Sequence, residues 1–127
     1  MEVTILIVDD SKLARIVLGK AVAALQPDWT RVEAGNADEA LAIVGRQKID
    51  VAVLDYNMPG RDGLALAEEL RGRFPEMSIA VATANVQDEV VAGARAANAT
   101  FINKPVTEEG MRGFLSGAAL RLRTTGK

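Results

Sequence analysis

The side chains in this sequence that are best suited to chemistry are carboxylates, one lysine and one hydroxyl, and each follows a short apolar run. They are Asp9, Asp10, Asp55, Thr83 and Lys104. The sequence contains no histidine and no cysteine, so acid–base or metal chemistry must use oxygen and amine groups. A carboxylate is rarely buried without a partner, so an aspartate that ends an apolar run is a candidate for a functional role.

The three aspartates predict a magnesium site if the fold brings them together. Converging carboxylates repel one another unless a cation lies among them, and Mg²⁺ prefers oxygen ligands. We expect Asp10 and Asp55 to bind the ion directly and Asp9 to hold a coordinated water. The backbone carbonyl of Asn57 could complete the shell. Taken alone, Asp9 and Asp10 are equally compatible with loop carboxylates near a helix N-terminus, where the helix dipole favours negative charge.

Lys104 and Thr83 suit phosphoryl chemistry at the same place. A lone lysine is usually a solvated surface residue, and a threonine in an apolar run is usually just a strand residue. Beside Asp55, however, they would supply a positive charge and a hydroxyl that can donate to an anion. A carboxylate can attack a phosphoryl group and form an aspartyl-phosphate, while cations neutralise the transferred oxygens. We therefore interpret Asp55 as a phosphorylation site.

Five short apolar runs predict the strands that would position these groups. They occupy residues 3–8, 31–34, 51–54, 79–82 and 99–102. Most are continuous, as in strands covered on both faces, and the more polar 31–34 run suits an edge strand. Segments with helical periodicity separate the runs, which predicts a parallel sheet with helices on both faces. Functional groups gather beyond the carboxyl ends of such strands, so the polar residues should share one edge.

Helical periodicity also predicts which helix faces are buried. In the first helical segment, the predicted core face comprises Leu13, Ile16, Val17, Ala21 and Ala24. In the second, Asn36 and Glu39 suit a variant of the capping box.

The last helical segment carries three glycines at near-helical spacing, which are Gly110, Gly113 and Gly117. Each costs about 1 kcal/mol relative to alanine in a helix interior. One hypothesis is a weak helix held by its apolar face. The other is a smooth stripe for close docking of a partner, flanked by Arg112 and Arg121.

Composition and charge argue against a disordered chain, a nucleic-acid-binding protein and a membrane protein. A hydrophobic content of 49% with 25% charged residues is typical of a folded domain. The net charge of −2 gives no sign of direct nucleic-acid binding. The start "MEVTILIVDDS" has no basic stretch before its apolar run, so we expect no signal peptide. Charges interrupt every apolar segment well short of the length needed to span a bilayer, so we expect no membrane insertion and a cytoplasmic chain. We expect one domain over residues 1–123 and a basic tail or the start of a linker at 124–127.

Four motifs resemble the signatures of response-regulator receiver domains of two-component signalling. They are "LIVDDS" at 6–11, "LDYNMPGRDG" at 54–63, "TAN" at 83–85 and "FINKP" at 101–105. The resemblance covers essentially the whole chain and extends to single-domain regulators of the chemotaxis type. It implies a flavodoxin-like, doubly wound (βα)5 fold whose five parallel strands have the order 2-1-3-4-5. It also implies a phosphoprotein that depends on Mg²⁺.

The resemblance assigns a role to each matched position. It implies Asp55 as the phosphoacceptor and Asp9 and Asp10 as the acidic pair that serves Mg²⁺. It further implies the following: Lys104 contacts the phosphate, Thr83 is the switch hydroxyl, Phe101 is the aromatic switch residue, Pro105 follows a cis bond, and Asn57 and Asn85 tune dephosphorylation.

The implied function is a signalling switch that phosphorylates and dephosphorylates itself, rather than a turnover enzyme. A histidine kinase or a histidine phosphotransfer protein would supply the phosphoryl group, in a two-component system or phosphorelay. Thr83 would then move toward the phosphoryl group and Phe101 would rotate inward. This would change the surface of the fourth helix, fifth strand and fifth helix, where a downstream protein would bind. The kinase, the target, the phosphorylation lifetime and the oligomeric state are not encoded in any motif.

Two other interpretations use the same residues. A Mg²⁺-dependent phosphohydrolase of the haloacid-dehalogenase type also forms an aspartyl-phosphate, but its nucleophile is the first residue of a D-x-D pair after the first strand. Here Asp9 and Asp10 are adjacent, and Asp55 follows the third run. A phosphorylation-independent binding module with a receiver fold often lacks one of the site residues, and this chain lacks none. The chain could be a stand-alone regulator, a relay intermediate or a receiver from a longer protein.

Overall fold

The computed structural model describes residues 2–84 and 87–124, in which strands and helices alternate along the chain. The strands are β1 (Thr4–Val8), β2 (Thr30–Ala34), β3 (Val51–Asp55), β4 (Ser78–Thr83) and β5 (Thr100–Asn103). The helices are α1 (Lys12–Leu25), α2 (Ala37–Arg46), α3 (Gly63–Arg73), α4 (Asp88–Ala96) and α5 (Glu108–Thr124). None of these helices combines the length and apolarity that a membrane crossing requires.

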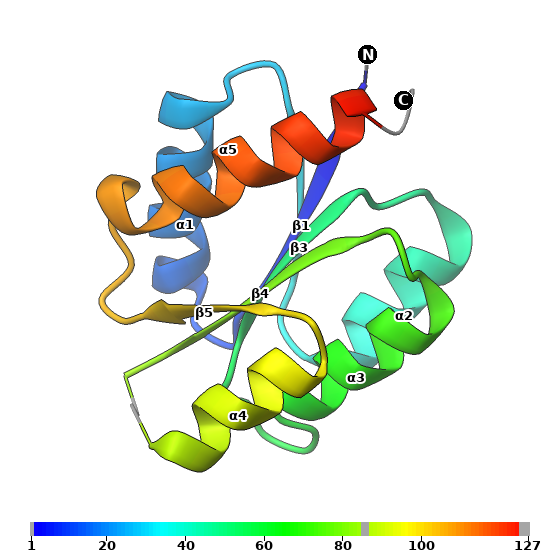
Figure 1. Ribbon diagram of the computed structural model, residues 1–127, viewed down its shortest axis with the longest axis vertical. Coiled ribbons are helices and arrows are strands. Elements are labelled where there is room, and N and C mark those ends of the chain that lie inside the picture. Colours follow the sequence, from blue (N-terminus) through cyan, green and yellow to red (C-terminus); the bar gives the residue numbers. More distant parts are fainter. Residues whose placement is uncertain (1, 85–86, 125–127) are drawn as a thin grey trace.

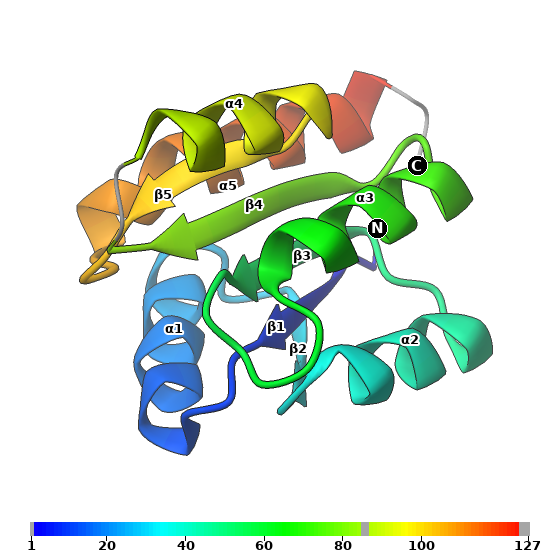
Figure 2. The same cartoon turned by 90° about the horizontal axis from the view of Figure 1, so that it is seen from below.

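All paired strands are parallel, and their order is β2-β1-β3-β4-β5. Helices α1 and α5 cover one face of the sheet, and α2, α3 and α4 cover the other (Figures 1 and 2). The predicted doubly wound α/β fold and its strand order are confirmed. The chain reverses its direction of progress across the sheet between β1 and β3, the place where this architecture collects functional groups.

Burial explains why the central strands read as continuous apolar runs. Every residue of β3 and β4 is buried, because helices pack on both faces of the sheet. One core cluster lies beneath α2 and α3, and the other lies beneath α1 and α5. The polar β2 lies at an edge of the sheet, as predicted.

The predicted core face of α1 is largely wrong. Leu13 is 71% exposed, Ile16 42% and Val17 48%, and Ala24 is also exposed. The helix instead buries Leu18, Ala21 and Val22. It carries apolar residues on two faces, so periodicity alone does not decide which face packs on the sheet. Leu18 and Val22 are one turn apart and both join the core beneath α1 and α5.

The predicted cap of α2 is confirmed. Asn36 is the N-cap residue, and its side chain accepts a hydrogen bond from the backbone N–H of Glu39 at 2.8 Å. The Glu39 carboxylate accepts from the backbone N–H of Gly35 at 2.8 Å, one residue before the cap. The reciprocal pair of a capping box is therefore present with its second bond shifted by one residue.

Candidate functional site

Four of the candidate side chains meet at the carboxyl edge of the sheet. Asp9 directly follows β1, Asp55 ends β3 and Thr83 ends β4. Asp9 is 1% exposed, Asp55 4% and Thr83 0%. Lys104 follows β5, and its backbone N–H donates to the carbonyl of Thr83 at 3.0 Å. Two strand ends and the residues that directly follow two other strands therefore bring polar groups to one largely buried place.

Lys104 links the two buried carboxylates. Its Nζ lies 2.8 Å from Oδ1 of Asp55 and 3.3 Å from Oδ2 of Asp9. The other oxygen of Asp9, Oδ1, accepts a hydrogen bond from the backbone N–H of Ser11 at 2.9 Å. The peptide bond between Lys104 and Pro105 is cis. The lysine thus offers its charge to the same carboxylate that the sequence singles out as a nucleophile.

The three aspartates form an all-oxygen cluster. One carboxylate oxygen from each of Asp9, Asp10 and Asp55 lies within 4.8 Å of the others, and Asp10 is exposed to solvent. Oδ1 of Asp55 is buried and, apart from its ion pair with Lys104, makes no hydrogen bond within the described residues. Among the described residues, Lys104 is the cation that pairs with this cluster, and it contacts Asp9 and Asp55, so three carboxylates share one positive charge. These residues fit Mg²⁺, which takes one or two carboxylates and keeps several waters on its open side.

The pKa values of the central pair reflect this shortage of positive charge. Burial, and then the charge of Asp9, raise the pKa of the Asp55 carboxyl, and these effects outweigh the opposing ones of Lys104 and the backbone amide of Asn57. Burial lowers the pKa of the Lys104 ammonium, but the carboxylates of Asp55 and Asp9 outweigh it, so the pKa is raised overall. Lys104 is therefore held charged, and Asp55 would gain from additional positive charge.

The turn after β3 holds Asp55 in place through a close backbone approach. Asp62 is the N-cap residue of α3, and its side chain accepts from the backbone N–H of Ala65 at 2.8 Å. The backbone N–H of Gly63 donates to the carbonyl of Tyr56 at 2.9 Å. A Cβ at Gly63 would lie 2.3 Å from the carbonyl oxygen of Asp55, so a glycine is needed here.

Sequence reasoning missed two residues that support the site, Gly63 and Arg15. Nη1 of Arg15 donates to the backbone carbonyl of Asp9 at 2.6 Å, and its Nε donates to Glu33 at 2.9 Å. Its side chain is only 18% exposed, so the guanidinium supports the backbone of the acidic loop at Asp9. An arginine in the first turn of the helix that follows an acidic pair is the signal that could have found it.

The remaining candidates lie around this cluster. Asn57 is exposed in the loop after β3, and Phe101 is half-buried on β5. Asn85 lies outside the described residues.

Comparisons with known proteins show the family. The sequence matches the family model for the response regulator receiver domain over residues 5–115. The positive alginate biosynthesis regulatory protein of Pseudomonas aeruginosa is 37% identical over 119 residues, which cover 91% of this chain and 46% of that protein. The transcriptional regulatory protein CitT of Bacillus subtilis is 39% identical over 84 residues, 65% of this chain and 37% of that protein. This chain spans less than half the length of either relative.

Solved structures share the fold. The chemotaxis protein CheY4 of Vibrio cholerae superimposes with a TM-score of 0.83 at 24% identity, covering 93% of this chain and 99% of that one. The structure of a probable two-component system response regulator/GGDEF domain protein gives 0.81 at 28% identity, covering 95% of this chain and 50% of that one. With the family model matched over residues 5–115, the chain belongs to the response regulator receiver domains of two-component signalling.

Proposed function

We propose that Asp55 receives a phosphoryl group from the phosphohistidine of a histidine kinase or a histidine phosphotransfer protein. A carboxylate oxygen of Asp55 attacks the phosphorus, the phosphorus–nitrogen bond breaks, and the donor imidazole leaves as the neutral base once it holds a proton. The observation that carries the proposal is the contact of Lys104 Nζ with Asp55 at 2.8 Å inside a cluster of three carboxylates.

Each residue of the cluster has a defined part in this step. Lys104 would contact the phosphoryl oxygens, and the hydroxyl of Thr83, at the end of the adjacent strand, would donate to them. Asp9, Asp10, Asp55 and the carbonyl of Asn57 would hold Mg²⁺. When bound, Mg²⁺ neutralises charge on the transferred oxygens. We propose that Asn57 and Asn85 tune the rate at which water removes the phosphoryl group.

The exposed apolar stripe of α1 supports docking of the phosphodonor beside this cluster. Leu13, Ile16 and Val17 are solvent-exposed at helical spacing, and the helix begins two residues after Asp10. An apolar patch next to a reaction centre suits a protein partner that must bring its phosphohistidine to Asp55. We expect Val17→Asp to slow transfer from a phosphorylated kinase while labelling by acetyl phosphate stays unchanged. Equal slowing with both donors would contradict docking on this stripe.

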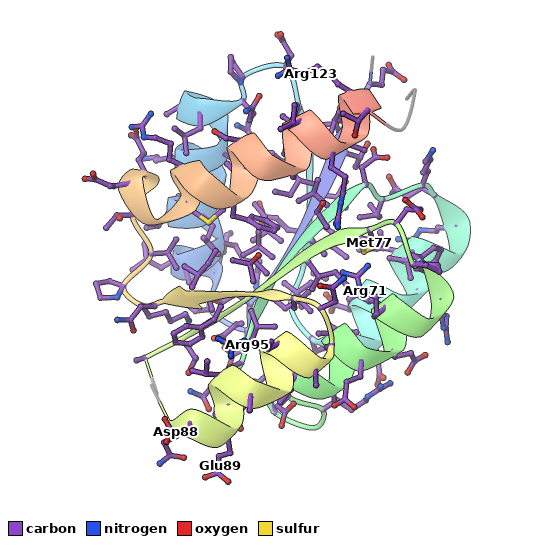
Figure 3. The ribbon with its side chains drawn as sticks, viewed as in Figure 1. Arg71, Met77, Asp88, Glu89, Arg95 and Arg123 are labelled. Atoms are coloured by element: carbon purple, nitrogen blue, oxygen red, sulfur yellow. The ribbon has the colours of Figure 1, made fainter. Side chains whose placement is uncertain are left out.

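The proposed output surface is formed by α4, β5 and α5, and the structure constrains how it could change. The guanidinium of Arg71 donates to the carbonyls of Ala97 at 3.1 Å and Asn98 at 2.9 Å, so it fixes the end of α4 to α3. The first turn of α4, with Asp88 and Glu89, lies at the other end of the helix (Figure 3). The N-cap residue Gln87 makes no side-chain capping bond. These contacts favour movement of the first turn of α4 over movement of its last turn.

The glycines of α5 fit the docking hypothesis better than the weak-helix hypothesis. A Cβ at Gly113 or Gly117 would find open space within 4 Å, so neither glycine is required by packing inside the domain. Both line a groove of about 350 Å³ that also contains Ser78 and Arg121. We expect a Gly113→Ala/Gly117→Ala variant to bind the downstream partner more weakly while Asp55 is phosphorylated normally. Unchanged binding would favour the weak-helix explanation.

The decisive experiment compares wild type with Asp55→Asn. Each protein is incubated with acetyl phosphate and Mg²⁺, and acid-labile phosphate is measured by intact-mass spectrometry and by cleavage with hydroxylamine. We expect an acyl phosphate on wild type alone. Equal labelling of both proteins would remove the proposal, and repeated turnover of a small phosphomonoester would favour a phosphohydrolase instead. The domain boundary at residue 123, the cytoplasmic location and the stand-alone or multidomain arrangement stay predictions.

A further inference from the structure

A second groove lies at the amino edge of the sheet, opposite Asp55. It is bounded by the end of α2, the loop before β3, the loop before β4 and the end of α5, and its volume is about 830 Å³. This is within the size range of ligand-binding clefts, roughly 300–1,000 Å³. Met77 and Arg123 mark this end of the molecule in Figure 3. No residue proposed to act in phosphorylation lines the groove.

The groove is rich in positive charge on a chain whose net charge is −2. Its cations come from α2, α3, α5 and the loop before β3, and they are Arg46, Lys48, Arg73 and Arg121. Within residues 2–84 and 87–124, Arg73 pairs with Glu69, whereas the other three cations form no ion pair.

The groove is lined by two acidic residues, Asp50 and Glu76, so its four cations outnumber its acids. Asp50 is 6% exposed, and its Oδ2 accepts from the backbone N–H of Thr4 at 2.9 Å. Glu76 is exposed and forms no ion pair among the described residues. A further guanidinium, Arg71, lies near these groups: burial and then the charge of Arg121 lower its pKa, and the charge of Glu76 opposes them. The groove therefore keeps an excess of positive charge.

Between the cations, the groove has an apolar floor. Ile49, Met77 and Leu122 are buried parts of the core that reach this surface, with exposed fractions of 7%, 3% and 8%. Phe74 is half-buried and Pro75 is exposed beside them. A basic border around an apolar floor is complementary to a ligand that carries acidic groups around apolar ones.

We propose that this basic groove binds a segment of a partner polypeptide in which acidic side chains flank at least one apolar side chain. A phosphate ion would use a small part of 830 Å³ and leave the apolar floor uncovered. A nucleic acid needs a continuous positive surface that follows its backbone, and this chain is acidic overall. The groove lies at the opposite edge of the sheet from Asp55, so the proposal does not depend on phosphorylation.

The test uses a library of random 12-residue peptides displayed on phage and panned against the whole, unphosphorylated chain. Selected peptides are synthesised and titrated into ¹⁵N-labelled protein. We expect the selected peptides to be enriched in aspartate and glutamate and to shift the amides of Lys48, Ile49 and Met77. The affinity should fall roughly tenfold or more in an Arg46→Gln/Lys48→Gln/Arg121→Gln variant and should weaken as salt rises. Arg112→Gln, on α5 but outside the groove, is the matched control and should bind as wild type does.

The proposal would be overturned by selected peptides without acidic enrichment, by amide shifts that map elsewhere, or by equal affinity for wild type and the triple variant. A single-stranded DNA oligonucleotide and phosphatidylglycerol vesicles are titrated in parallel, and binding of either at these amides without peptide binding would also refute it. Because the three substituted cations are exposed, the variant should keep its circular dichroism spectrum and its labelling by acetyl phosphate. Asp55→Asn should still bind the peptides, so loss of phosphorylation and loss of groove binding are separable.

Discussion

Replacing Asp55 with asparagine is expected to stabilise the protein in buffer without Mg²⁺. The carboxylate is 4% exposed, and one carboxylate oxygen from each of Asp9, Asp10 and Asp55 lies within 4.8 Å of the others. Asparagine keeps the shape of the side chain and removes its charge. After the substitution, Lys104 keeps its contact with Asp9 at 3.3 Å, so the lysine does not become a lone buried charge.

The magnitude follows from three opposing effects. With an effective dielectric of about 20, attraction to Lys104 at 2.8 Å is worth about 6 kcal/mol, and repulsion from Asp9 at up to 4.8 Å costs about 3.5 kcal/mol. Asp10 repels less, because water screens its exposed charge. Burial of a carboxylate costs several kcal/mol more, which exceeds the remaining attraction. We expect Asp55→Asn to raise the free energy of unfolding by about 1–2 kcal/mol, with about 3–5 °C in Tm for each kcal/mol.

Both added Mg²⁺ and low pH should reduce the stability advantage of Asp55→Asn over wild type. Urea and thermal unfolding are measured by circular dichroism with EDTA and then with Mg²⁺, which should stabilise wild type by about 2.7 kcal/mol at one hundred times its Kd and Asp55→Asn by less. The raised pKa means that the folded state binds a proton on Asp55 more tightly than the unfolded chain does. In EDTA, wild type should therefore gain on the variant as pH falls through the folded pKa, until the gain is complete below the ordinary value of 3.8. A variant less stable than wild type in EDTA, or an equal response of both proteins to Mg²⁺, would refute the reasoning.

Three further substitutions test the groups that support the site. Gly63→Ala should lower the free energy of unfolding by about 1–3 kcal/mol, because its Cβ would lie 2.3 Å from the carbonyl oxygen of Asp55. Gly72→Ala is the control and should not lower it, because its Cβ meets open space. Urea unfolding measures both variants. Arg71→Met should cost about 1–3 kcal/mol and speed hydrogen exchange at the end of α4, because backbone carbonyls lose their donor. Arg15→Met should weaken Mg²⁺ binding roughly 10-fold in a calorimetric titration, by freeing the carbonyl of Asp9. Unchanged values would contradict the supporting role in each case.

The fold and the central cluster could be predicted from the sequence because parallel strands bring their carboxyl ends to one edge. Once five apolar runs are interpreted as parallel strands, Asp9, Asp55, Thr83 and Lys104 must lie near one another, whatever the details of the loops. Each of these residues directly follows or ends a strand, so its place depends on few unknown dihedral angles. The structure brings these four together, and Lys104 contacts both carboxylates.

The surfaces could not be predicted in the same way, because they depend on the rotation of each helix about its axis. Leu13, Ile16 and Val17 have the spacing of a core face, yet Leu18 and Val22 have it as well, and only packing against the sheet selects between them. The basic groove is formed by the ends of three helices and by two loops that are far apart in the sequence, and no local pattern marks them. Gly63 likewise looks like any turn glycine until its distance to the Asp55 carbonyl is known.

Lys104 is already ion-paired before phosphorylation, and this affects which residue could transmit the phosphorylation signal to α4 and β5. Moving a population from 1:99 to 99:1 requires about 5.5 kcal/mol of differential stabilisation, and only contacts that differ between the two states contribute to it. Lys104 already pairs with Asp55 and Asp9, so a phosphoryl oxygen would mostly exchange one negative partner for another. Thr83 ends the adjacent strand, and a charge-assisted hydrogen bond from its hydroxyl to the phosphoryl group, worth about 1.5–3 kcal/mol, would exist only in the phosphorylated state. We therefore expect Thr83→Ala to accept phosphate from acetyl phosphate at a rate close to wild type, yet to lose most of the phosphorylation-dependent amide shifts in α4 and β5. Full shifts in Thr83→Ala would show that the lysine, rather than the hydroxyl, transmits the change.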